Sequence, residues 1–351
     1  MSNPFQLSTS KPGHGCIVLS ILPPHTPRLK TCSYQYPLKL VAPDPLLVPS
    51  HLSSPSSAAS AEVKKEEDNV LVHTVYLLSY GGGLVAGDSV HLSISLDPTT
   101  RLVLLTQGST KIFISPSGDV VTRQVLTSQL GQGSALCYLP DPVQPFAHSA
   151  FEQTQIYHLE KLGGANLCVC DWVCRGRSAR GENWNVWRYV SRNEVWLSPS
   201  SSSSSHEKGK EKGEKKRLLL RDNILLEDGT ADSSFAGRMD GMGAYGTLIL
   251  HGPLLSNLGQ FFMHEFESMP RIGARNWDGD VEEVTSLRKR RELQEAKDEL
   301  LWTAAQIRGF VLVKFGAREV EGVKRWLLAM LREEGSVERV FGERALMCLK
   351  S

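Results

Sequence analysis

The feature that most constrains this fold is an alternation of apolar and polar residues over short segments. Val90, Leu92, Ile94 and Leu96 are each separated from the next by a polar residue. Side chains of a β-strand point alternately to its two faces, so this pattern predicts a strand that is buried on one face. Similar segments recur along the chain, and Gly, Pro, Asn and Asp separate them at short intervals, as is typical of all-β proteins. We expect further strands at residues 71–80, 101–106, 111–114, 120–130, 135–139, 151–160, 166–174, 185–197, 218–226, 246–252 and 307–315.

Helical periodicity appears only late in the chain. Residues 253–267 and 318–334 carry apolar side chains at helical spacing, the first behind Pro253 and the second ahead of Gly335. Pro at a helix start and Gly after a helix end are favoured positions. Residues 281–301 are strongly charged and leave two alternatives open, a helix or a mobile insertion. The sequence therefore predicts a mainly β protein with two α-helices in its C-terminal third.

Two segments are too polar and too low in complexity to belong to a core. Residues 49–68 are rich in Ser and Ala and then charged, and residues 198–216 are a run of Ser, Lys and Glu. Such segments bury too little apolar surface to offset the entropy cost of ordering them. We interpret both as flexible inserts in a single domain of residues 13–335, with residues 281–301 as a third, charged insert.

The charge balance and the cysteines exclude some classes of protein. The 351 residues include 39 Lys and Arg against 38 Asp and Glu, whereas proteins that bind nucleic acid usually carry a large basic excess. No apolar stretch approaches the roughly 18 residues of a membrane span, and the apolar run at 16–22 lacks a signal-peptide cleavage site. The seven cysteines contain no C-x-x-C pair. We therefore expect a cytoplasmic protein with reduced thiols that binds neither nucleic acid nor membrane.

The most distinctive segment is Tyr-Gly-Gly-Gly-Leu-Val-Ala-Gly-Asp at residues 80–88, directly after an expected strand. A dinucleotide-binding loop requires a helix after the glycines, because the helix N-terminus holds the phosphate. Here a strand pattern follows instead, and no Gly-Lys-Ser/Thr sequence closes the run. We interpret Gly82, Gly83 and Gly87 as parts of a turn between two strands, with Asp88 at its exit.

In a second segment, residues 166–174, an acid lies among positions that the pattern predicts to be buried. Asp171 lies on one face of this expected strand together with aliphatic residues. The opposite face carries Cys168, Cys170, Trp172 and Cys174. Three thiols on one face are compatible with a soft metal ion, although a buried Cys beside a Trp is more often a small packing residue. A buried carboxylate needs a partner or a functional role, and Arg177 is the candidate partner of Asp171.

Two further segments are stiff or polar turns. Residues 139–146 contain three Pro residues that fix an extended crossing around Asp141, and residues 106–111 place Lys111 beside Gly and hydroxyl side chains. Either segment can be read as a ligand contact or as a satisfied turn. The sequence contains neither a G-x-S-x-G elbow nor an H-E-x-x-H zinc motif. Paired carboxylates of the glycosidase type have no fixed spacing, so that class stays open.

Taken in order, these segments resemble the UreD (UreH) family of urease accessory proteins. The resemblance rests on residues 77–88, 106–113, 138–142, 145–146, 171–182, 193–196 and 245–248, and it spans residues 13–332. The three inserts depart from the family pattern and read as loop expansions of a eukaryotic, fungal member. Within these motifs, we expect a structural role for the following residues: Gly82, Gly83, Gly87, Lys111, Gly176, Arg177 and Gly181.

The resemblance implies a fold and a function that the residues alone do not give. The family fold is an elongated, solenoid-like β-superhelix of antiparallel and mixed sheets with two helices. Members are not enzymes but scaffolds that help apo-urease to mature, together with UreF-type and UreG-type partners, of which the UreG-type partner is a GTPase. The resemblance also implies that Ni²⁺ passes through the protein in transit and that no cofactor is tightly bound.

A carrier of this kind has to release its metal. Clustered Cys and His bind Ni²⁺ tightly, whereas spaced carboxylates, carbonyls and water would hold it loosely enough to move on. We hypothesise that the acids within the resembling motifs line such a nickel path: Asp88, Asp141, Asp171, Glu182 and Glu194. Their competing role is to hold turns and Arg partners. The alternative function is a stand-alone β-solenoid hydrolase with Asp171 and Glu182 as acid and base, which would be active without partners.

Overall fold

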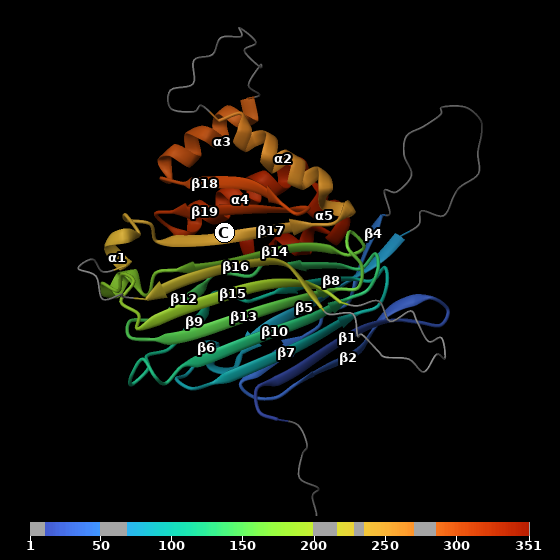
Figure 1. Cartoon of the computed structure of the whole chain (residues 1–351), viewed down its shortest axis with the longest axis horizontal. Coiled ribbons are helices and arrows are strands. Elements are labelled where there is room, and N and C mark those ends of the chain that lie inside the picture. The colour runs from blue at the N-terminus through green and yellow to red at the C-terminus, as the bar shows by residue number, and fades with distance from the viewer. Residues whose placement is uncertain (1–10, 50–68, 199–215, 228–234, 270–285, 351) are drawn as a thin grey trace, which may run out of the picture.

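The protein is a layered β structure in which two sheets lie face to face and helices cover the outer side of the larger sheet (Figure 1). The computed structural model describes residues 11–49, 69–198, 216–227, 235–269 and 286–350. The expected mainly β fold with a few helices is confirmed. The expected inserts at 49–68 and 198–216 fall almost entirely outside the described residues.

The smaller sheet has seven strands in the order β16-β15-β13-β10-β7-β1-β2. Its strands are β1 (His14–Leu22), β2 (Thr26–Tyr34), β7 (Ser89–Leu96), β10 (Thr122–Leu130), β13 (Ala150–Leu159), β15 (Arg188–Leu197) and β16 (Arg217–Glu227).

The larger sheet has twelve strands, eight of them in the order β18-β19-β17-β14-β11-β8-β5-β3. These are β3 (Leu38–Val41), β5 (Asn69–Ser79), β8 (Arg101–Leu105), β11 (Ala135–Tyr138), β14 (Asn166–Cys174), β17 (Ala244–His251), β18 (Leu301–Ile307) and β19 (Phe310–Ala317). Four short strands lie beside this path: β4 (Leu46–Pro49), β6 (Gly83–Leu84), β9 (Thr110–Ile112) and β12 (Val143–Pro145).

Most helices follow the strands late in the chain. They are α1 (Phe235–Arg238), α2 (Ser256–Glu267), α3 (Ser286–Lys297), α4 (Val320–Glu334) and α5 (Ser336–Phe341). Short 3₁₀ turns are η1 (Tyr80–Gly82), η2 (Ser178–Arg180), η3 (Pro253–Leu255) and η4 (Glu343–Leu349). The two expected helices correspond to η3 with α2 and to α4. None of the described helices is long and apolar enough to cross a membrane.

The chain alternates between the two sheets as it builds the centre of the molecule. It passes from β7 to β8, then to β10, β11, β13, β14 and β15, and each strand lies parallel to its predecessor in the same sheet. Antiparallel strands complete the edges, and neither sheet closes on itself within the described residues. Because of this winding, the turns that follow successive strands of one sheet become neighbours in space.

Alternation within the strands divides the core into two clusters. On β8, Leu102 and Leu104 point into the space between the sheets, whereas Val103 and Leu105 point towards the helices. The larger sheet therefore contributes to both clusters, and its interior strands are buried on both faces. The helix-side cluster continues past Gly335 to Leu349.

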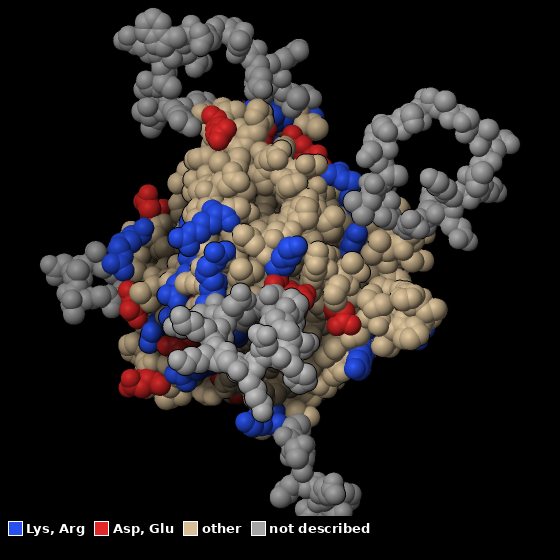
Figure 2. All heavy atoms as spheres, turned by 45° about the vertical axis from the view of Figure 1, so that its right-hand side comes forward, with Lys and Arg blue, Asp and Glu red and all other residues tan. Residues whose placement is uncertain are grey.

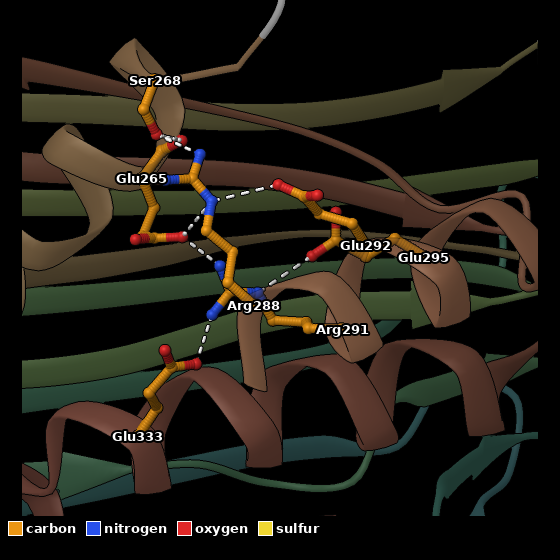
Figure 3. Close-up of polar contacts among 7 residues, drawn as sticks. All are labelled: Glu265, Ser268, Arg288, Arg291, Glu292, Glu295 and Glu333. Atoms are coloured by element: carbon orange, nitrogen blue, oxygen red, sulfur yellow. Dashed lines mark hydrogen bonds and ion pairs between the residues drawn. The ribbon is translucent and has the colours of Figure 1, made fainter. Parts of the chain in front are cut away.

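Within the charged stretch at 281–301, residues 286–297 form helix α3. Of the two alternatives, a helix or a mobile insertion, the structure therefore has the helix. Arg291 is buried between Glu265 of α2 and Glu333 of α4 and donates to both carboxylates (Figure 3). Arg288 binds Ser268 and lies 3.6 Å from Glu265. Ion pairs rather than an apolar stripe therefore attach α3 to the helical layer.

Candidate functional site

The motifs that stand out in the sequence lie side by side at one end of the sheets. β6 pairs with β9, β9 pairs with β12, and β12 pairs with β14, all in parallel (Figure 1). Gly83 allows the closest approach in this ladder, because a Cβ atom there would lie 2.7 Å from the carbonyl oxygen of Lys111. The Gly-rich turn, residues 106–111 and the Pro-rich segment thus form one continuous region, although Lys111 itself is exposed.

The Gly-rich segment connects β5 to β7 through turns, as the sequence predicted, but Gly83 is extended and belongs to the short strand β6. Gly82 and Gly87 have φ values of 73° and 83°, in the left-handed region that favours glycine. The Asp88 carboxylate accepts a hydrogen bond from the Val85 N–H at 2.9 Å and so closes the turn before β7. A cavity of about 270 Å³ lies between η1 and residues 106–110. Asp88 holds this turn and is not among the residues that line the cavity.

Asp141 connects the motif loops to the helical layer. Its carboxylate accepts hydrogen bonds from the Gly108 N–H at 3.0 Å and from the Thr106 hydroxyl at 3.3 Å. The Lys324 ammonium of α4 lies 2.6 Å from the same carboxylate. This buried acid is therefore neutralised by one cation and held by the loop of residues 106–108.

Glu182 is tied to Arg177, which corrects the expectation that Arg177 pairs with Asp171. The Glu182 carboxylate accepts bonds from the Arg177 guanidinium, from the Arg177 N–H at 2.9 Å and from the Ala147 N–H at 3.2 Å. Burial alone would raise the pKa of Glu182, but these bonds outweigh it and hold the pKa below its ordinary value. Gly176 is required here, because a Cβ atom would lie 2.6 Å from Glu182 Oε2. Gly181, with a φ of 76°, caps the adjacent turn η2.

Asp171 lies between the two sheets, on the face that the alternation predicted. It is 2% exposed and accepts hydrogen bonds from Ser191 Oγ and Asn193 Nδ2, each at 2.6 Å, and from Gln153 Nε2 at 3.1 Å. Burial raises the pKa of Asp171, and the bonds from Ser191 and Asn193 offset only part of that shift. The three partners belong to the opposite sheet, so a buried acid links the two sheets through polar contacts.

The same interior contains a second charged group that the sequence analysis missed. Lys314 of β19 donates to Asp222 of β16 at 2.7 Å and to the Thr247 hydroxyl of β17 at 3.4 Å. Asn193 is the register partner of Asp222, and Asp171 is the register partner of Thr247. A polar residue at an inward position between aliphatic neighbours was the available signal, since Asp222 stands between Leu220 and Ile224.

Together these side chains form a line across the strands that we name the interior polar row. It runs over the neighbouring strands β10, β13, β15 and β16 of one sheet and β14, β17 and β19 of the other. Its innermost contact joins Gln124 to Gln153 at 3.3 Å, and its outer end is Lys314, whose side chain is 34% exposed. The members are Gln124, Gln153, Asp171, Ser191, Asn193, Asp222, Thr247 and Lys314.

Glu194 points away from this row. It lies on the outer face of the smaller sheet, where its carboxylate accepts bonds from the Trp196 indole at 2.9 Å and from Arg221 at 3.0 Å. The five predicted acids therefore occupy separate places, and only Asp171 belongs to the interior polar row. Over the described part of the chain, no three His, Cys, Asp or Glu side chains come together in a way that would hold a metal ion.

The cysteines of β14 lie on the helix-facing side of the larger sheet, as expected. Cys168, Cys170 and Cys174 are buried in the helix-side cluster beside Trp172. Burial raises the pKa of Cys170 well above its ordinary value and that of Cys174 to about 12. Burial disfavours the thiolate form of Cys170 and Cys174, which is the form that ligates metals, and all three thiols pack in the hydrophobic cluster, which supports a packing role.

On the face shown in Figure 2, Lys and Arg side chains gather over one half of the described surface with fewer Asp and Glu side chains beside them, and broad areas carry neither. The described residues thus define a two-sheet β scaffold with a polar row inside it.

Comparison with known proteins identifies the family. The sequence model of the UreD urease accessory proteins matches residues 17–346. The urease accessory protein 4 of Cryptococcus neoformans is 30% identical over 94% of this chain and 93% of its own length. An uncharacterised UreD-like urease accessory protein of Schizosaccharomyces pombe is 29% identical over 86% of this chain and 88% of its own length. The urease accessory protein D of Arabidopsis thaliana is 31% identical over 65% of this chain and 64% of its own length. The chain belongs to the UreD family of urease accessory proteins.

Proposed function

We propose that this protein is a non-catalytic scaffold in the insertion of nickel into urease. In this role it takes Ni²⁺ from a complex with UreF-type and UreG-type partners, the latter a GTPase, and passes the ion to apo-urease in the cytoplasm. The ion is cargo in transit, and no cofactor stays bound. Membership of the UreD family supports the link to urease.

The interior polar row is the observation that carries the proposal. Most of the space between the sheets is filled by aliphatic and aromatic side chains, and burying polar groups there is costly unless they are paired. The row nevertheless extends from the centre of the smaller sheet to its edge strand, β16. Two of its acceptor oxygens, Asn193 Oδ1 and Asp222 Oδ2, are buried and have no hydrogen-bond partner within the described structure. Acceptors of this kind suit a passing cation or a water molecule.

The donor set of the row fits weak binding. Carboxylate, amide and hydroxyl oxygens are poorer ligands for Ni²⁺ than clustered imidazoles and thiolates, so an ion held by them is released readily. Lys314 already supplies a positive charge at the outer end of the row. A divalent ion that enters there has to compete with this ammonium for Asp222, which further weakens its binding.

The hydrolase alternative gains no support from the geometry. Asp171 and Glu182 have different hydrogen-bond partners, and neither lines any of the cavities described for this structure. Glu182 is held by Arg177, so its carboxylate is engaged as an acceptor on both oxygens.

Deleting the gene in its host tests the proposed function. We expect normal amounts of urease protein but little urease activity at ordinary nickel levels, with activity restored when the gene is returned. Unchanged urease activity in a host without a second copy would contradict the proposal. Activity of the purified protein alone towards a hydrolase substrate would favour the alternative.

Substitutions in the row test the route. We expect Asp171→Asn and Asp222→Asn to lower urease activation severalfold, while the control Asp119→Asn, at an exposed acid on a turn, leaves it unchanged. Thermal unfolding of each purified variant separates loss of folding from loss of the route. If Ala replaces Asp88, Asp141, Asp171, Glu182 and Glu194 in a folded protein and urease activation persists, the path through these acids is wrong.

A further inference from the structure

Arg101 is a buried cation that has no acidic partner among the residues that the structure describes. It is the first residue of β8 and is 7% exposed. One guanidinium nitrogen donates to the Val340 carbonyl oxygen of α5 at 2.8 Å, and this is its one hydrogen bond among the described residues, where it forms no ion pair. A guanidinium has five N–H donors, so most of those of Arg101 have no partner among the described residues. Burial lowers the pKa of Arg101, which reflects the cost of keeping this charge away from water.

A cavity of about 590 Å³ lies beside this guanidinium, and its lining includes Leu47 of β4, the short strand labelled in Figure 1. Arg101 is one of its lining residues. Ile21, Val70 and Leu254 contribute apolar walls from three different segments, and none of the lining residues is Asp or Glu. The polar side chain of Asn166 is already satisfied, because its amide bonds the Ser134 carbonyl and the Leu254 N–H. Arg101 is therefore the one permanently charged group among the described residues that line this cavity.

The chemistry of the cavity selects a class of ligand. A buried, unpaired charge is costly, and an oxyanion that binds it recovers that cost through charge-assisted hydrogen bonds. The planar guanidinium fits a carboxylate in a bidentate manner. His25, Thr26, Asn69 and Thr99 add polar side chains to the lining, but Arg101 is the one Lys or Arg among the described lining residues. The single negative charge of a carboxylate matches one arginine, whereas a phosphate dianion would be matched by two cations.

We propose that this cavity binds an organic carboxylate with an apolar body, held by the guanidinium of Arg101. The ligand is either a free acid or the carboxylate at the end of a peptide chain, since both present the same group. This site is separate from the interior polar row, and its existence does not depend on a role in nickel transfer.

Isothermal titration of the full-length protein, in a buffer free of carboxylate and phosphate, tests the site. The probes are hexanoate against hexanamide, and acetyl-Ala-Leu-Leu with a free C-terminus against its C-terminal amide. We expect each acid to bind roughly tenfold or more tightly than its uncharged counterpart. Tighter binding of hexanoate assigns the site to a free acid, and tighter binding of the peptide assigns it to a chain terminus. Equal binding of acids and amides, or no binding, would overturn the proposal.

Substitutions connect any binding to Arg101. We expect Arg101→Gln to abolish the preference for the acids, although it also removes a contact to α5. Val70→Glu avoids that difficulty, because Val70 lines the cavity and lies two residues before Val72, the register partner of Arg101. An internal carboxylate at position 70 should occupy the guanidinium and exclude the probe, whereas the neutral control Val70→Gln should bind it. Equal binding by the two Val70 variants would count against the site.

Discussion

At the scale of single residues, two buried acids in one sequence motif have opposite environments. The pKa of Asp171 is raised because burial dominates, and the pKa of Glu182 is lowered because hydrogen bonds from Arg177 and Ala147 dominate. Alternation along residues 166–174 placed Asp171 on the correct face. It gave no information about partners, because Ser191 and Asn193 come from the other sheet. The sequence therefore located the acid but assigned its partner wrongly.

Glu182→Gln should lower the free energy of unfolding by about 2 kcal/mol at pH 7, because the charge-assisted bonds from Arg177 are lost. The folded-state pKa of Glu182 lies below its ordinary value of 4.5, so its stabilising contribution is present above pH 4.5 and disappears as the pH falls further. The difference between the native protein and the variant should therefore shrink below that pH. Urea unfolding at several pH values measures it.

A matched substitution at an exposed acid, Glu299→Gln, serves as the control for this pH dependence. Its unfolding free energy should differ little from that of the native protein at any of these pH values, because exposed ion pairs contribute little. If Glu182→Gln changed the free energy of unfolding as little as the control does, the ion pair with Arg177 would not contribute to stability.

At the scale of elements, the residue patterns predicted most central strands, including β8, β11 and β14, which are buried on both faces, but they missed β1 and β18. In β1, Cys16 and Val18 are only half-buried, yet they are apolar like the inward Ile17 and Leu19, so no alternation is visible. The edge strand β18 has mostly exposed residues and no polar-apolar pattern. Both strands take their place from tertiary pairing, which a local pattern does not encode.

Helix α3 gives the prediction that belongs to this scale. Arg291 is buried between Glu265 and Glu333, and removing one member of a buried ion pair leaves the others uncompensated. Arg291→Met should therefore lower the free energy of unfolding by about 3 kcal/mol. The neighbouring exposed residue provides the control, and Arg290→Met should have little effect. Denaturation in urea, followed by circular dichroism, compares the two variants, and equal stabilities would show that the network does not hold α3 in place.

At the scale of the whole molecule, the winding of the chain between the sheets explains why the interior polar row could not be predicted. Its members extend from Gln124 to Lys314 and come together only because seven strands stack in a particular order. Sequence motifs identified the Gly-rich turn and the region around β14, which are local. They did not identify Asp222 or Lys314, whose importance depends on the register between distant strands.

The shared sheet also determines how the molecule should unfold. The larger sheet contributes one face to the cluster between the sheets and the other to the cluster under the helices, so neither cluster survives without it. We therefore expect one cooperative transition in urea, with far-ultraviolet circular dichroism and tryptophan fluorescence changing together. The indoles report on different layers, because Trp326 lies in the helix-side cluster and Trp184 in the cluster between the sheets.

Single-tryptophan variants separate the two reports. One variant keeps only Trp326 and the other keeps only Trp184. In each variant, the fluorescence midpoint in urea should coincide with the midpoint measured by circular dichroism. Phe replaces the other indoles to limit the loss of core volume. Two distinct midpoints would mean that the helical layer separates before the sheets do. The single domain expected from the sequence would then consist of two folding units joined by one sheet.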